Sequence, residues 1–159
     1  MIKKTVLALL VAAVAWAGVQ QPFTVLFFND FHARLEPFTL KGQEGTVGGI
    51  ARLATVVNSI RAENDRGGVP TFLFVAGDTL QGSPYSTVYR GAAEFACLNE
   101  MGVTAMCLGN HEFDYGRDNI AALMATATFP ILAANVAVEG PDGPRPFAGD
   151  VTVLVAGNV

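Results

Sequence analysis

The segment Thr71-Phe-Leu-Phe-Val-Ala-Gly-Asp78 decides the fold. In an extended chain, its first six residues would present apolar side chains on both faces, and a glycine and a carboxylate follow them directly. Strands with two apolar faces are typical of sheets that are covered on both sides. Residues 71–76 are therefore a predicted strand. Other segments of the same character predict further strands over residues 23–28, 103–108, 129–134 and 151–156.

Amphipathic segments lie between these strands. Residues 139–147 contain three prolines and two glycines and are predicted to form a surface loop. Elsewhere the spacing of apolar residues predicts three helices: one from Ile50 to near Asp65, one through residues 88–96 that ends at Gly102, and a weaker one through residues 120–124 that ends near Pro130.

The alternation of strands and helices predicts an α/β layered fold. A helix that crosses over between two strands of one sheet makes those strands run parallel. In open parallel sheets, ligands bind just outside the carboxyl ends of the strands. The functional residues are therefore expected directly after each predicted strand.

Polar side chains occupy those positions. The two histidines of the chain, His32 and His111, both belong to this set. If the strands are parallel, the whole set gathers at one edge of the sheet. The segments that follow the first four strands are Asn29-Asp30-Phe31-His32, Gly77-Asp78-Thr79-Leu80-Gln81-Gly82, Gly109-Asn110-His111-Glu112-Phe113-Asp114 and Asn135.

The candidate metal ligands are Asp30, His32, Asp78 and Asn110. They offer carboxylate and amide oxygens and an imidazole nitrogen but no thiolate, which suits Zn²⁺, Mn²⁺ or Fe rather than a structural thiolate zinc site. The two oxygens of Asp78 could bridge two cations. Two cations about 3.5–4 Å apart would clamp a phosphate and generate a hydroxide nucleophile at neutral pH.

The candidate catalytic residue is His111, which directly follows Asn110. Its imidazole could protonate a leaving oxygen or stabilise charge on a transferring phosphoryl group, and Asp114 could orient the ring. Taken singly, these groups have ordinary explanations as loop carboxylates, a surface histidine or a helix N-cap. The hypothesis of a metal site depends on their joint occurrence at successive strand ends.

Residues 1–17 have the layout of a secretory signal peptide. Lys3 and Lys4 precede an apolar run, and Ala15-Trp16-Ala17 is a small-x-small cleavage site. An uncleaved membrane anchor is the alternative. We expect residues 18–159 to be exported as one domain, secreted or periplasmic, without a stable membrane anchor after cleavage.

Charge and cysteine content narrow the classes of function. The chain has 14 acidic and 10 basic side chains without a basic cluster, which argues against binding to a nucleic acid polymer. Cys97 is predicted on a helix and Cys107 on the next strand, an arrangement that would not bring their Cα atoms within bonding range. Two buried free thiols are expected, and a disulfide stays open as the alternative.

The motifs resemble the first signatures of the calcineurin-like metallophosphoesterases. The spelling of the segments that begin at Gly77 and Gly109 is similar to that of the 5′-nucleotidase and 2′,3′-cyclic-nucleotide phosphodiesterase branch. The resemblance extends from about Phe23 to Asn135, and Ala33 stands where the family often has glycine.

This resemblance implies a four-layer αββα sandwich that holds two divalent metal ions, Zn, Mn, Mg or Fe. The implied activity is hydrolysis of small phosphate esters, chiefly nucleoside 5′-monophosphates, with 2′,3′-cyclic nucleotides as a further substrate class. Asn135 matches a signature without an assigned ligand role. The implied roles are Asp30 and His32 at the first metal, Asp78 as the bridging carboxylate, Asn110 at the second metal, and His111 with Asp114 as the catalytic pair.

The resemblance covers only the N-terminal part of such a catalytic domain. The family places further metal-binding histidines after the Gly-Asn-His motif and adds a C-terminal nucleotide-binding domain, whereas no histidine follows His111 here. We therefore expect a fragment with an incomplete sandwich. The alternatives are a thiosulfohydrolase of sulfur oxidation on the same scaffold and a non-catalytic truncated product.

Overall fold

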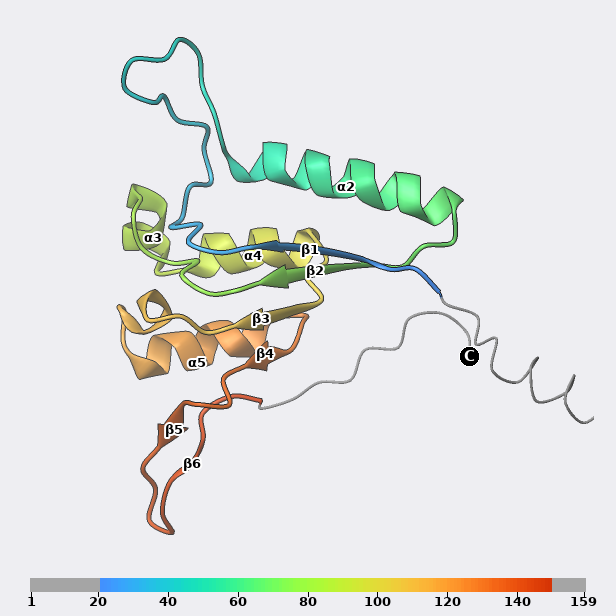
Figure 1. The fold of residues 1–159 in the computed structure, drawn as a ribbon. Coiled ribbons are helices and arrows are strands. Elements are labelled where there is room, and N and C mark those ends of the chain that lie inside the picture. The colour runs from blue at the N-terminus through green and yellow to red at the C-terminus, as the bar shows by residue number, and fades with distance from the viewer. Residues whose placement is uncertain (1–20, 150–159) are drawn as a thin grey trace, which may run out of the picture.

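A sheet of four parallel strands lies at the centre of the computed structural model, which describes residues 21–149 (Figure 1). Its strand order is β1-β2-β3-β4, and each neighbouring pair is parallel. The first four predicted strands and their parallel arrangement are thereby confirmed. The strands are β1 (Thr24–Phe28), β2 (Thr71–Val75), β3 (Ala105–Cys107) and β4 (Ile131–Leu132).

Two expectations concern residues outside the described part of the chain, namely the signal peptide over residues 1–17 and the strand over residues 151–156. Within residues 21–149, none of the helices combines the length and the apolar character needed to cross a bilayer.

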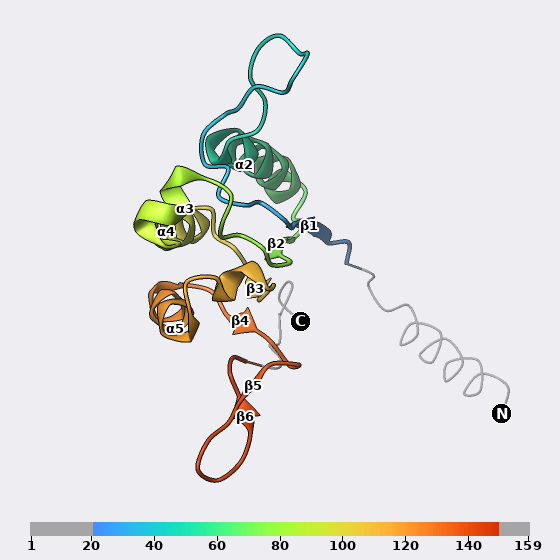
Figure 2. The same ribbon diagram turned by 90° about the vertical axis from the view of Figure 1, so that its left-hand side faces the viewer.

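The helices that connect the strands lie on one face of the sheet (Figure 2). Right-handed crossovers that move in one direction along a parallel sheet place every connection on the same side, and the sequential strand order therefore produces this single helical layer. The connections are α2 (Ile50–Arg66) between β1 and β2, α3 (Pro84–Tyr89) and α4 (Ala92–Glu100) between β2 and β3, and the short η1 (His111–Phe113) and α5 (Arg117–Thr126) between β3 and β4.

The hydrophobic core lies between this helical layer and the sheet. Phe28, Val75, Met106 and Ile131 are neighbours in register across the four strands; the last three are buried in the core, and the partly buried Phe28 packs against it. Complete burial of a large apolar side chain stabilises a fold by about 1.5–3 kcal/mol, and this row therefore anchors the helices. The helices contribute Val57, Phe95, Leu98, Ile120 and Leu123.

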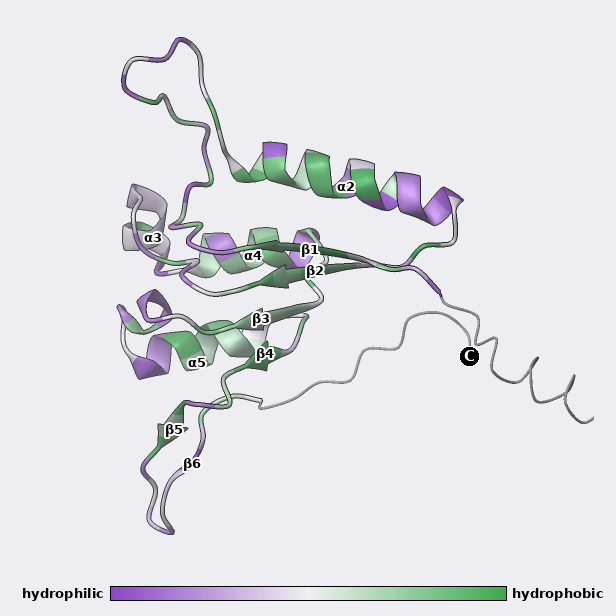
Figure 3. Ribbon diagram, in the orientation of Figure 1, coloured by the Kyte–Doolittle hydropathy of each residue, from purple (hydrophilic) through white to green (hydrophobic). Residues whose placement is uncertain are grey.

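The opposite face of the sheet is also apolar. Phe27, Phe74 and Ala105 are aligned in register, and Phe27 is 72% exposed. The strands of this sheet are hydrophobic over most of their length (Figure 3), which is the pattern of a sheet covered on both sides. Residues 21–149 thus supply one helical layer and one sheet layer, which is the α/β architecture predicted from the sequence.

The prediction of one helix through residues 88–96 is wrong, because two helices occupy this region. Arg90 and Gly91, between α3 and α4, both have left-handed backbone angles, with φ of 49° and 97°. A Cβ atom on Gly91 would lie 2.6 Å from the side chains of both Leu80 and Leu123. The chain therefore breaks at a glycine where it approaches the core too closely for a side chain.

The prediction of a loop over residues 139–147 is also wrong at its end. Strand β5 (Ala137–Val138) pairs with β6 (Arg145–Pro146) in an antiparallel hairpin, and the residues between them form its turn. Proline has no backbone N–H to donate, but it is tolerated at the edge of a sheet. A two-stranded ribbon has only edges, so Pro146 fits there.

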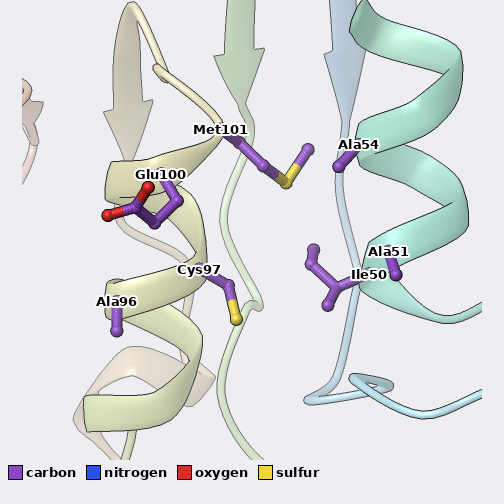
Figure 4. Close-up of a pocket in the computed structure, with 7 residues that line it drawn as sticks. All are labelled: Ile50, Ala51, Ala54, Ala96, Cys97, Glu100 and Met101. Atoms are coloured by element: carbon purple, nitrogen blue, oxygen red, sulfur yellow. The ribbon is translucent and has the colours of Figure 1, made fainter.

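Both cysteines are free in the structure, as expected. Cys97 is half-buried and points into a shallow apolar groove between α2 and α4, beside Ile50 (Figure 4). The expectation of burial is wrong for Cys107, which is exposed. The reason is its position, two residues after Ala105, on the face of the sheet that the helices do not cover.

We predict that Gly91→Ala destabilises the fold more than Gly42→Ala. Both glycines have positive φ, 97° and 82°, so alanine costs about 1–2 kcal/mol at either position. Only at Gly91 would the new methyl group meet core side chains, and such overpacking costs about 1–3 kcal/mol more. Urea denaturation followed by circular dichroism measures both, and equal free energies of unfolding would contradict the packing argument.

Candidate metal centre

The loops that follow β1, β2 and β3 meet at the carboxyl edge of the sheet, where the sequence analysis expected the functional residues. The first loop lies along the second and is joined to it by backbone hydrogen bonds. The N–H of His32 donates to the carbonyl oxygen of Asp78 at 3.0 Å, and the N–H of Ala33 donates to that of Thr79 at 2.9 Å. His32 is therefore held beside Asp78 by the main chain.

The third loop is joined to the second through the Asp78 side chain. The backbone N–H of His111 donates to Oδ1 of Asp78 at 3.1 Å. Gly77 and Gly109 make this approach possible, since a Cβ atom on Gly77 would lie 2.6 Å from the backbone nitrogen of Gly109. The two glycines that precede the motifs thus let the loops pack backbone against backbone.

Several residues of these loops have left-handed backbone angles although they are not glycines. The φ angles are 50° at Asp30, 49° at His32, 52° at Ala33 and 53° at Asp78. Each such residue costs of order 1 kcal/mol or more, and such strain clusters at functional sites. All four are predicted metal ligands or the direct neighbour of one, so this strained backbone coincides with the candidate site.

The side chains of His32, Asp78 and His111 form a compact donor cluster. Each offers one ligand atom, and these atoms lie within 4.8 Å of one another. The rings of His32 and His111 meet edge to face with centroids 5.0 Å apart. Imidazole nitrogens with a carboxylate oxygen fit Zn²⁺, Mn²⁺ or Fe²⁺, and the residues present are thus chemically suited to a divalent metal ion.

The other predicted ligands lie beside this cluster rather than in it. Oδ1 of Asp30 is 3.7 Å from Nε2 of His32, and the side chain of Asp30 is 59% exposed and contacts the amide of Asn29. Asn110 is exposed and directly precedes η1, which begins at His111. Asn135 lies exposed in the turn between β4 and β5. The ligand roles of Asp30 and Asn110 stay predictions.

His111 and Asp114 form a close pair. Nδ1 of His111 lies 2.7 Å from Oδ2 of Asp114, and both side chains are about one-third exposed. The hydrogen bond to Asp114 raises the pKa of the His111 imidazole, as do the negative charges of Asp114, Asp78 and Glu112, while burial opposes the shift. Because Asp114 occupies Nδ1, the other ring nitrogen, Nε2, is left for a substrate or a metal ion.

Glu112 is the residue that the sequence analysis missed. It directly follows the Gly-Asn-His motif, and no role was predicted for it. The structure buries it completely between the second and third loops, where it accepts hydrogen bonds from both. An acidic residue directly after Asn110 and His111 could have indicated a supporting role, since the groups of a metal site are commonly held in place by further carboxylates.

Comparisons with known proteins identify relatives of this chain. The chain is 39% identical to 5′-nucleotidase of Bos taurus over 140 residues, which are 84% of this chain and 24% of that protein. It is 36% identical to the crystal structure of the 5′-nucleotidase precursor from Thermus thermophilus, with a TM-score of 0.66, over 75% of this chain and 23% of that one. The chain thus spans about a quarter of the length of these relatives.

A sulfate thiohydrolase of Thermus thermophilus superimposes with a TM-score of 0.75 over 88% of this chain and 34% of that one. Its sequence identity is 19%, so it shows a shared fold alone. The family model described as calcineurin-like phosphoesterase matches residues 23–145, which include every candidate site residue. The chain therefore belongs to the calcineurin-like phosphoesterase family.

Proposed function

We propose that this protein hydrolyses phosphate esters, chiefly nucleoside 5′-monophosphates, with the help of two divalent metal ions. The observation that carries the proposal is the donor cluster of His32, Asp78 and His111, which three separate loops bring within 4.8 Å. Relatives of 36–42% identity that are named 5′-nucleotidases support the choice of nucleotides.

In this proposal, Asp30 and His32 would hold the first metal ion, Asp78 would contribute to both, and Asn110 would hold the second. When bound, the ions would act as Lewis acids toward the phosphate and the attacking water. The chain itself contributes the fixed positions of these ligands. The backbone bonds from His32 and Ala33 to the second loop hold His32 beside Asp78.

His111, although it lies in the donor cluster, is proposed to act on the leaving group rather than as a metal ligand. Its raised pKa keeps a larger fraction of the imidazole protonated near neutral pH. As the bond between phosphorus and the ester oxygen breaks, Nε2 donates its proton to that oxygen, which leaves as the nucleoside hydroxyl. Asp114 keeps the ring oriented through Nδ1 and stabilises its charge.

The proposed location of this reaction is outside the cytoplasm. The lysines, apolar run and small-x-small step within residues 1–17 support it, since this is the pattern of an exported protein. Hydrolysis of 2′,3′-cyclic nucleotides is proposed as a second activity because of the motif spelling at Gly77 and Gly109. Assays of the intact protein with nucleoside monophosphates, cyclic nucleotides and thiosulfate esters would separate these substrate classes.

Removal of metal from the intact protein should abolish release of phosphate from adenosine 5′-monophosphate, and Mn²⁺ or Zn²⁺ should restore it. Asp78→Asn should lower kcat/KM by about 100-fold or more, because a group that organises transition-state charge is lost. Asp118→Asn is the matched control, since its side chain is 93% exposed and pairs only with Arg117 in the described structure. Full activity of Asp78→Asn would refute the proposed site.

The two histidines should respond differently to the same substitution. His111→Gln should lower kcat by about 10²- to 10⁴-fold, the contribution typical of a general acid, while the affinity for Mn²⁺ is kept. His32→Gln should instead weaken Mn²⁺ binding, measured by titration calorimetry. A parallel loss of Mn²⁺ affinity in His111→Gln would place His111 among the metal ligands rather than beside them.

In the metal-free protein, the pKa of His111 should lie above that of an ordinary histidine, and Asp114→Asn should lower it. NMR titration resolves the effect, because the chain has only one other histidine. A raised folded-state pKa stabilises the fold fully below the ordinary histidine pKa, and this contribution is lost as pH rises through the raised value. An unchanged pKa in Asp114→Asn would contradict the pairing.

A further inference from the structure

We infer that Glu112 is a positioning residue whose carboxylate fastens the second and third motif loops to each other. The clamp, as we call this carboxylate with the amides that donate to it, adjoins the donor cluster at Asp78, whose backbone N–H it accepts. Its effect on metal binding rests on the proposed function, whereas its effect on the loops does not.

The clamp consists of backbone N–H groups from both loops that converge on one side chain. Oε2 accepts hydrogen bonds from the N–H of Asp78 at 2.9 Å and from the N–H of Gly109 at 2.7 Å. Oε1 accepts one from the N–H of Thr79 at 2.7 Å and a longer one from that of Leu80 at 3.4 Å. Glu112 is 0% exposed, so water does not compete for these bonds.

The backbone geometry creates the need for such a side chain. Asp78 has a φ of 53° and Gly77 a φ of 84°, which turn consecutive N–H groups of the second loop to the same side. A Cβ atom on Gly109 would lie 2.7 Å from the backbone nitrogen of Asp78, so the third loop brings its own N–H to the same place. Buried N–H groups without acceptors would destabilise the fold.

Only an aspartate or glutamate side chain offers two acceptor oxygens with enough lone pairs for all of these donors. A glutamine at this position would present one oxygen and one NH₂ group, and the NH₂ group would face backbone donors. The NH₂ group would take the place of one of the two oxygens, so either Asp78 and Gly109 or Thr79 and Leu80 would lose their acceptor. Replacement of Glu112 by glutamine, which has the same shape, therefore breaks the clamp at one of its two oxygens with little change in volume.

The clamp sets the relative position of the groups that the reaction uses. It holds the backbone of Asp78 directly, and Oδ1 of Asp78 in turn accepts the N–H of His111 at 3.1 Å. Glu112 also follows His111 in the chain, within the same η1 turn. The separation of Asp78 and His111 is thus fixed by a residue that supplies no atom to the donor cluster.

A purely structural role would predict a general loss of stability, and a positioning role predicts a local change. The test is amide hydrogen exchange of the intact, metal-free protein, compared between wild type and Glu112→Gln. We expect one of the two pairs of amides, Asp78 with Gly109 or Thr79 with Leu80, to exchange about ten-fold faster or more, while the amides of α4 and α5 keep their protection. Unchanged exchange at both loops would overturn the inference, as would a uniform increase.

Glu94→Gln is the matched control, because Glu94 is also buried, at 1% exposure, but its carboxylate makes none of the bonds of the clamp. It should leave exchange at both loops unchanged. Glu112→Asp keeps two oxygens on a shorter side chain and should restore part of the protection. If Glu112→Gln does not fold, Glu112→Asp is used for the test instead. The inference would be overturned if the loop amides of Glu112→Asp exchanged at wild-type rates, or if its helices lost their protection as well.

Binding of Mn²⁺ provides the second readout. Loss of a supporting residue typically weakens metal binding about 10- to 100-fold, and this loss is expected in Glu112→Gln but not in Glu94→Gln. Equal Mn²⁺ affinity in wild type and Glu112→Gln would overturn the link to metal binding. Absence of Mn²⁺ binding in the wild type would refute the proposed function, and the exchange measurement would still decide whether the clamp exists.

Discussion

The parallel arrangement of β1 to β4 is the constraint on which the site depends. Each strand enters from the same side, so the loops after β1, β2 and β3 leave at one edge and can touch. An antiparallel neighbour would send its loop to the opposite edge. The crossovers also put the helices on one face of the sheet. The core residues there, which include Val75 and Met106, hold the strands in register and so align the points at which the loops begin. Packing under the sheet thus determines where His32, Asp78 and His111 meet.

Within that edge, the main chain does most of the positioning. Asp30, His32 and Asp78 adopt left-handed angles that are unfavourable for non-glycine residues. Such angles persist only where the surroundings fix them, and here the surroundings are bonds between loops, such as that from the N–H of His32 to the carbonyl of Asp78. The cost of the strained backbone is therefore offset locally. A consequence is that the donor cluster is preorganised, which reduces the entropy that a ligand would otherwise lose.

The sequence was sufficient for features with a strong local or periodic signal. The apolar run before Asp78 and the helical spacing after Ile50 predicted β2 and α2, and the strand-end rule predicted that Asp78 and His111 would meet. The break at Gly91 was missed because its cause is tertiary: the chain there passes close to Leu80 and Leu123, which lie far from it in the sequence. The role of Glu112 was missed for the same reason, since its partners are backbone groups that no sequence pattern displays.

Ala33 shows how the chain can depart from the family pattern without disturbing the site. Its φ of 52° explains why glycine is common at this position, since only glycine adopts that angle without cost. Alanine has the smallest side chain that could replace it, and the bond from its N–H to the carbonyl of Thr79 holds the strained angle in place. The methyl group is fully buried and supplies no donor atom. A larger or β-branched residue would raise the cost of the same angle, and the strain would then act on the neighbouring His32 and on the donor cluster.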